Sequence, residues 1–149
     1  MSEQQERQLS VVVGYYNYGD LKALEEALGG TGITILSAVQ DAQRVFDDAV
    51  GLEADVVLLC PQVSGYRPQM ITDLLLHRER AIPVVGWAEA TSDDGRAMVS
   101  VGAKGFVTLP MDVQQGNKAV GLLRAAVEDA ERERQAGEVK VRPVPSSRL

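Results

Sequence analysis

The sequence has few of the residue types that mark disulfide-bonded, metal-binding and membrane-spanning proteins. Its 149 residues include one cysteine, one histidine, one tryptophan and two phenylalanines. A single cysteine cannot form an internal disulfide, and it offers no pair of thiolates for a zinc module. Residues 1–8 contain no apolar signal core, and no segment approaches the roughly 18 apolar residues of a membrane span. We therefore expect a cytoplasmic protein without membrane insertion.

The number and distribution of charged residues indicate whether the protein could bind nucleic acid. The chain has 15 Lys and Arg against 21 Asp and Glu, a formal net charge of -6, and its basic residues are scattered. Binding to nucleic acid calls for clustered cations that neutralise phosphates, so we expect no direct nucleic-acid surface. With 45% hydrophobic and 24% charged residues, the composition is typical of one soluble globular domain.

Apolar runs alternate with helical repeats along the chain. Short apolar runs predict strands at Leu9–Val13, Ile33–Val39, Val56–Leu59, Ile82–Trp87 and Gly105–Leu109. Apolar residues at helical spacing predict helices at about 21–28, 42–50, 68–80, 95–101 and 113–135, with Asp41 as the N-cap of the second. Strict alternation with short connections predicts a doubly wound α/β fold, a parallel sheet with helices on both faces.

The two ends of the chain differ from this pattern. Residues 1–8 are polar and are predicted to form a disordered tail before a domain that spans residues 9–135. Residues 136–149 contain two prolines and two serines without helical periodicity, which predicts an extended linker or C-terminal tail.

The only cysteine follows a strand that is predicted to be central. Val56–Leu59 is apolar on both faces, as in the middle of a parallel sheet. Open α/β sheets bind ligands beyond the carboxyl ends of such strands, so Cys60 is a candidate for chemistry. Thiolate chemistry needs a nearby cation, a histidine or a helix N-terminus. Two hypotheses follow: Cys60 is a small hydrophobe that fills space, or it has a redox or covalent role.

The order of elements and several short motifs resemble the receiver domain of response regulators, the CheY-like form of the flavodoxin fold. The matching stretches lie in order and at receiver spacing; they are Asp55–Leu59 with Pro61 and Gly65, Ile82–Val85, Gly102–Ala103 and Gly105–Pro110. The resemblance covers residues 9–135. It implies a five-stranded parallel sheet of strand order 2-1-3-4-5 with five helices.

The residues that support phosphorylation in receivers do not carry over. Tyr15 and Tyr16 occupy the positions of the magnesium-binding acidic pair, and Cys60 occupies the position of the phosphoacceptor aspartate. Ala88 stands in place of the switch hydroxyl, and Leu109 in place of the lysine. Two phenols and a thiol make a poor Mg²⁺ site, and without metal and lysine little neutralises a transferring phosphoryl group. We therefore expect no cofactor, no metal and no enzymatic activity, and we predict that Cys60 fills space in a former acidic pocket.

The resemblance also indicates a partner surface. In receivers the fourth helix, fifth strand and fifth helix form the usual dimer face, which corresponds here to residues 92–134. Its candidate apolar residues, some of which must instead belong to the core, are Met98, Val99, Val101, Phe106, Leu122 and Leu123. We expect a protein partner on this face, in the first place a second copy of the chain.

A degenerate pocket ahead of a Pro/Ser-rich segment also resembles the TadZ or CpaE group of pilus-assembly proteins. In that group an atypical receiver-like domain precedes a ParA or MinD-like ATPase, which implies a module that localises a larger machinery and an ATPase domain beyond the linker. Two alternatives stay open. One is an orphan response-regulator receiver that controls transcription through a separate DNA-binding domain. The other is a small-ligand sensor, although the Gly-rich phosphate loop of a nucleotide site is missing.

Overall fold

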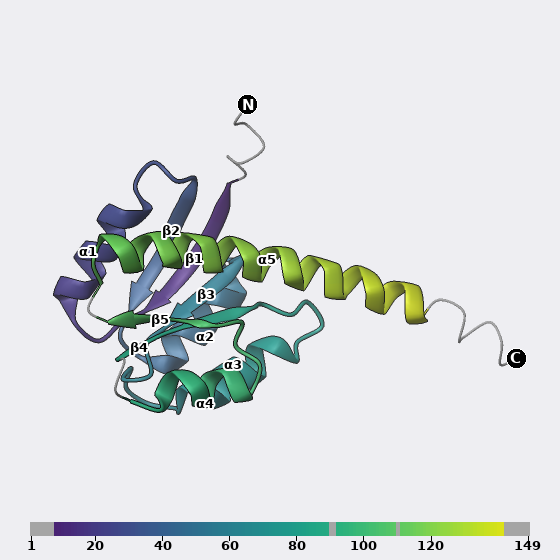
Figure 1. Cartoon of the computed structure of the whole chain (residues 1–149). Coiled ribbons are helices and arrows are strands. Elements are labelled where there is room, and N and C mark those ends of the chain that lie inside the picture. Colours follow the sequence, from purple (N-terminus) through teal and green to yellow (C-terminus); the bar gives the residue numbers. More distant parts are fainter. Residues whose placement is uncertain (1–7, 90–91, 110, 142–149) are drawn as a thin grey trace, which may run out of the picture.

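The protein's structure is a computed structural model that describes residues 8–89, 92–109 and 111–141. Strands and helices alternate throughout this part of the chain (Figure 1). In chain order the elements are β1 (Leu9–Gly14), α1 (Tyr18–Leu28), β2 (Ile33–Val39), α2 (Ala42–Gly51), β3 (Val56–Leu59), α3 (Pro68–Leu76), β4 (Val84–Glu89), α4 (Asp94–Ser100), β5 (Phe106–Leu109) and α5 (Val113–Val141).

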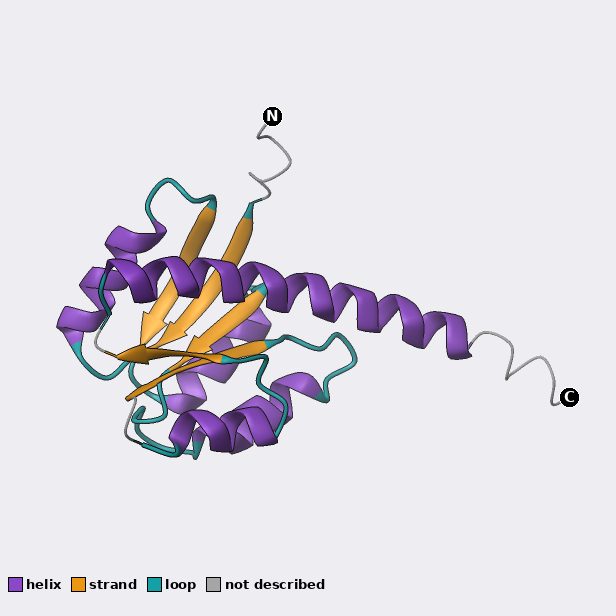
Figure 2. Ribbon diagram, in the orientation of Figure 1, coloured by secondary structure: helices purple, strands orange, loops and turns teal. Residues whose placement is uncertain are grey.

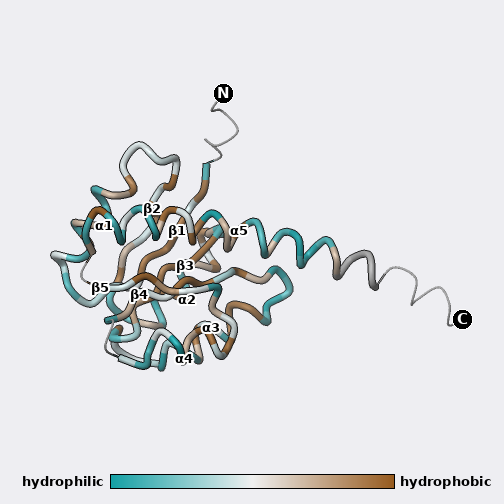
Figure 3. The backbone as a smooth tube through the Cα atoms, viewed as in Figure 1, coloured by the Kyte–Doolittle hydropathy of each residue, from teal (hydrophilic) through white to brown (hydrophobic). Residues whose placement is uncertain are grey.

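The five strands form one parallel sheet in the order β2-β1-β3-β4-β5, which confirms the predicted topology. All four residues of β3 are buried, because this strand lies in the middle of the sheet with helices on both faces. Helices α1 and α5 cover one face of the sheet, and α2, α3 and α4 cover the other (Figure 2). The apolar colouring of the central strands in Figure 3 marks the same core.

Trp87 of β4 belongs to this core. Only 1% of the residue is exposed. The indole Nε1 is buried and has no hydrogen-bond partner among the described residues.

Helix boundaries agree with the prediction at most ends. Asp41 is the N-cap of α2, and its Oδ2 accepts a hydrogen bond from the Arg44 N–H at 3.0 Å. Helix α3 ends at Leu76, earlier than the predicted Arg80, because the chain turns there and the Ile82 N–H donates to the Leu75 carbonyl at 3.0 Å on its way into β4.

Helix α5 runs further than predicted. It continues to Val141 instead of ending near Gln135, so residues 136–141 of the predicted linker are helical. Figure 1 shows this helix extending beyond the edge of the sheet. Residues 142–149 of the predicted linker, residues 1–7 of the predicted tail and Pro110 lie outside the described residues. Among the described helices, none is long and apolar enough to cross a membrane.

Several contacts hold α5 on the domain. The Arg124 side chain donates to the Thr31 carbonyl in the turn after α1. The Gln115 side chain accepts a hydrogen bond from the Thr108 N–H at 2.9 Å, which satisfies a donor of the edge strand β5. Further along the helix, Lys104 Nζ lies 2.8 Å from Glu133 Oε2.

Candidate functional site

The predicted site residues converge on one edge of the sheet. Gly14 at the end of β1 lies beside Leu59 at the end of β3, and Glu89 at the end of β4 lies beside Leu109 at the end of β5. This carboxyl edge is where parallel sheets bind ligands. The degenerate positions that follow or close these strands are Tyr15, Tyr16, Cys60, Ala88 and Leu109.

Cys60 is enclosed by the surrounding protein. Only 1% of the residue is exposed. Its backbone N–H donates to the Gly14 carbonyl at 2.9 Å, which extends the pairing of β1 with β3 by one residue. Its Sγ lies 3.9 Å from the Gln62 Oε1, a weak hydrogen bond typical of a thiol. The site therefore contains a small, buried and neutral side chain.

The electrostatic surroundings keep this thiol protonated. Burial raises the pKa of Cys60 above its usual range, and the carboxylates of Asp20, Asp94 and Glu89 raise it further. A hydrogen bond from the Gln62 backbone opposes these effects only in part. Because the thiolate is the reactive form, Cys60 has the character of an inert buried cysteine rather than that of a nucleophile.

The two tyrosines at the former acidic positions lie in different surroundings. Tyr15 is partly buried against the core, and its N–H donates to the Val39 carbonyl at 3.0 Å. Tyr16 is 59% exposed. The two phenols therefore do not form a pair of ligands beside Cys60.

The remaining positions are apolar. Ala88 is buried in β4, and Leu109 packs against the core. Among the described residues no group of three or more His, Cys, Asp or Glu side chains is arranged to hold a metal ion. Asp20, Asp94 and Glu89 influence Cys60 through their charge, although they do not gather into a ligand set.

The loops around Cys60 are linked to one another by polar contacts that the sequence did not reveal. The Ser64 N–H donates to the Gln40 carbonyl at 3.0 Å, and the Ala42 N–H donates to the Ser64 carbonyl at 2.8 Å. The Gln40 side chain in turn donates to the Tyr16 carbonyl at 3.0 Å. Gln40 and Ser64 are far apart in the sequence and belong to no motif, so only the fold brings them together.

The predicted partner face keeps four of its six apolar residues. Met98 and Leu123 are fully buried, so these two are the candidates that belong to the core and not to the partner face. The reason is that α4 and α5 turn these positions toward the sheet, where the Met98 Sδ would lie 3.2 Å from a Cβ placed on Gly86. Val99 is 42% exposed. The partly exposed members are Val101, Phe106 and Leu122.

The Phe106 ring lies against α4. A Cβ placed on Gly95 would be 2.6 Å from a ring carbon of Phe106, so only glycine leaves room for the aromatic side chain at this position. This contact joins β5 to α4 within the predicted partner face.

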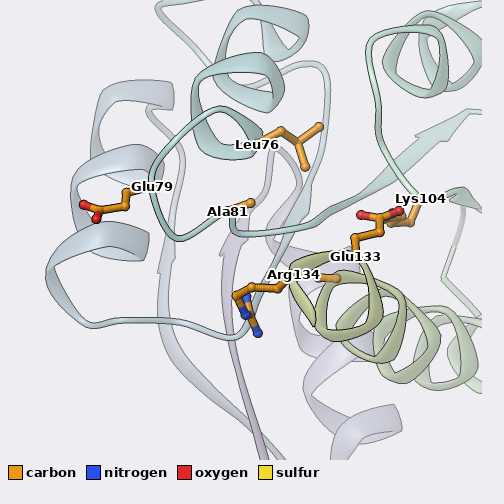
Figure 4. A pocket seen from close by; sticks show the side chains of 7 residues that line it. Leu76, Glu79, Ala81, Lys104, Glu133 and Arg134 are labelled. Carbon is orange, nitrogen blue, oxygen red and sulfur yellow. The ribbon is translucent and has the colours of Figure 1, made fainter. Parts of the chain in front are cut away.

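A surface hollow at the opposite edge of the sheet lies away from Cys60. Its volume is about 190 Å³, and Lys104 and Glu133 are on its wall (Figure 4). The other lining residues are Leu76, Glu79, Ala81, Ala130 and Arg134. Its walls carry charges of both signs above an apolar floor.

Solved structures of receiver domains share the fold of this chain. No known protein-family model matches the sequence, and no curated protein matches it. Solved structures match over most of the chain. The response regulator domain of Thermotoga maritima CheB has a TM-score of 0.69 at 15% identity, covering 82% of this chain and 98% of that one.

Two further structures give the same result. The signal receiver domain of a modulated diguanylate cyclase from Desulfovibrio desulfuricans has a TM-score of 0.70 at 13% identity, covering 85% of this chain and 98% of that one. The chemotaxis response regulator CheY4 of Vibrio cholerae has a TM-score of 0.65 at 14% identity, covering 78% and 98%. The fold is therefore the CheY-like fold of response-regulator receivers.

Proposed function

We propose that this protein is a receiver-like module that binds other proteins without being phosphorylated. The observation that carries the proposal is the burial of Cys60, the residue that we match to the phosphoacceptor, under the influence of the carboxylates of Asp20, Asp94 and Glu89. Phosphoryl transfer needs a metal and positive groups to neutralise developing charge. Among the described residues of this edge, no cluster of carboxylates is arranged to hold a metal, which supports the proposal.

The linked loops support a module with one fixed conformation. Contacts through Gln40 and Ser64 hold the loops after β1, β2 and β3 together on the degenerate edge. A phosphorylation switch needs an element with two arrangements that a new charge can bias. We propose that the binding face is permanently presented.

The proposed partner face is made by α4, β5 and α5. Its apolar members are Val99, Val101, Phe106 and Leu122, and either a protein partner or a second copy could cover them. Helix α5 would connect this face rigidly to whatever domain its C-terminal end leads to, because a continuous helix carries orientation as well as position.

The larger assembly is proposed from the resemblance to the TadZ and CpaE group. In that setting the module would localise a pilus-assembly machinery, with an ATPase domain following residues 142–149. An orphan receiver attached to a DNA-binding domain predicts a different continuation of the gene. Sequencing the gene beyond Leu149 separates the two, because an ATPase would show a Walker motif and a DNA-binding domain would not.

Intact mass spectrometry with a small-molecule phosphodonor tests the central claim. We expect no added phosphate mass with or without Mg²⁺, and an unchanged light-scattering mass in both conditions. A receiver that retains the acidic pair, the aspartate and the lysine serves as the positive control. A gain of one phosphate on this chain, coupled to a change in oligomeric state, would overturn the proposal.

A further inference from the structure

The outward face of α3 carries apolar side chains that the domain leaves uncovered. Met70 is 48% exposed and Leu74 is 46% exposed, one helical turn apart. Tyr66, directly before the helix, is 49% exposed. The opposite face of α3, with Ile71 and Leu75, is buried against the sheet.

The neighbouring helix also has an uncovered apolar side chain. Helices α3 and α4 pack together, and a Cβ placed on Gly102 would lie 2.5 Å from the Leu76 Cδ1. Val99 of α4 is 42% exposed. Three large apolar side chains of α3 and α4, together with Tyr66 before α3, are therefore uncovered, and exposed apolar surface of this kind marks protein contacts.

The charges on α3 indicate which partner fits. Arg67 lies at the N-terminal end of the helix and is exposed. Asp73 lies at the other end of the exposed face, where its Oδ1 is 3.1 Å from the Nδ1 of His77. Met70 is midway between them in sequence. Opposite charges thus flank Met70 three residues before it and three residues after it in the sequence.

Such a face is complementary to itself when two copies are antiparallel. A two-fold axis beside Met70 would place Arg67 of each copy near Asp73 of the other, with the two Met70 side chains between the charged pairs. A parallel arrangement would instead oppose Arg67 to Arg67 and Asp73 to Asp73, which is unfavourable.

We propose that the α3 face pairs two copies of this chain in an antiparallel arrangement, and that the α4–β5–α5 face is left for a different protein partner. The inference rests on the proposed function of the chain as a protein-binding module. A helix of nine residues offers less than the roughly 800 Å² per partner of a standard interface. The dimer should therefore be weak and should dissociate on dilution.

Cysteine cross-linking tests this arrangement in the full 149-residue chain. Met70→Cys and Leu74→Cys are each made in a Cys60→Ala background, which contains no other thiol. Leu52→Cys is the matched control, because Leu52 is 51% exposed and lies after α2. We expect at least one α3 variant to form a covalent dimer with diamide at least tenfold faster than the control. Equal rates for all three variants would overturn the proposal.

A charge swap tests the antiparallel geometry. Arg67→Asp and Asp73→Arg should each weaken the dimer, and the double variant should restore it, as measured by sedimentation over a range of concentrations. Both single changes suit the helix dipole, because they put an acid at the N-terminal end and a base near the C-terminal end. A weaker dimer would therefore reflect the lost charge pairs between the two copies and not a loss of helical structure in α3. If neither single substitution weakens the dimer, or if the double variant does not restore it, the antiparallel pairing is contradicted.

These outcomes are separable from failure of the proposed function. If the chain gains phosphate mass, the proposed function fails whatever α3 does. If it gains none and the α3 variants cross-link no faster than Leu52→Cys, the module stands and only the assignment of the dimer to α3 is wrong.

Discussion

A Cβ atom placed on Gly116 of α5 would lie 2.6 Å from the Cβ of Ala27 in α1. The two helices on this face of the sheet therefore approach one another closely because Gly116 has no side chain. The contact fixes the start of α5 on the domain, at the end of the helix opposite to the Lys104–Glu133 ion pair.

We predict that Gly116→Ala destabilises the protein by about 1–3 kcal/mol, the usual cost of overpacking. Gly121→Ala on the same helix is the control. A Cβ there meets nothing within 4 Å, so the better helix propensity of alanine should stabilise the protein by about 0.5–1 kcal/mol. Urea unfolding of both variants measures the difference. Equal effects of the two substitutions would contradict the close contact.

The buried Cys60 thiol should react slowly with an alkylating reagent at pH 7. Burial raises its pKa, with three carboxylates acting in the same direction, so little thiolate is present. The exposed thiol of Leu52→Cys in the Cys60→Ala background provides the matched control. We expect Cys60 to react at least tenfold more slowly. A comparable rate in the native protein would show that the thiol is accessible and activated.

The raised pKa of Cys60 also predicts a stability change at high pH. Above about pH 8.5 the unfolded chain loses the thiol proton while the folded protein still holds it. The free energy of unfolding should therefore fall as the pH rises through this window. Cys60→Ala has no thiol and lacks this contribution. Between pH 7 and 10 we therefore expect the native protein to lose more of its unfolding free energy than the variant does. A constant difference would contradict the burial of the thiol.

Restoring an aspartate at position 60 should not restore a receiver. Cys60→Asp places a carboxylate in a buried site among Asp20, Asp94 and Glu89, where it gains no cation. We predict a loss of roughly 3 kcal/mol or more in the free energy of unfolding at pH 7, with partial recovery at acidic pH. Cys60→Ser, which introduces no charge, should lose less. Phosphate incorporation by Cys60→Asp alone would show that the neighbouring tyrosines and leucine are no obstacle.

Asp55 should contribute to stability at the amino end of β3, away from the degenerate site. Its Oδ2 accepts hydrogen bonds from the Ser10 N–H at 2.9 Å and from the Ser10 Oγ–H at 3.2 Å, and these join the starts of β1 and β3. We predict that Asp55→Ala costs about 1–3 kcal/mol, because the part-buried donors lose their acceptor. Asp93→Ala removes an almost fully exposed carboxylate and should cost under about 0.5 kcal/mol. Thermal unfolding of the two variants compares them.

The position of Cys60 could be predicted because it depends on a local pattern. Cys60 follows an apolar run that is typical of a central strand, and the structure places it at the carboxyl end of β3. The surroundings of each tyrosine could not be predicted. Tyr15 and Tyr16 are adjacent and identical in chemistry, and only the packing of the β1–α1 loop leaves one half-covered and the other exposed.

The sequence by itself determined the order of strands and helices, because hydrophobic periodicity and turn residues are local properties of the chain. It also determined that a thiol follows directly after the third strand. Only the tertiary structure decided that Met98 and Leu123 are core while Met70 and Leu74 are surface, since all four are apolar residues at helical spacing. Which side of a helix faces the sheet depends on how α3, α4 and α5 pack against it, and that packing follows from contacts between segments far apart in the sequence.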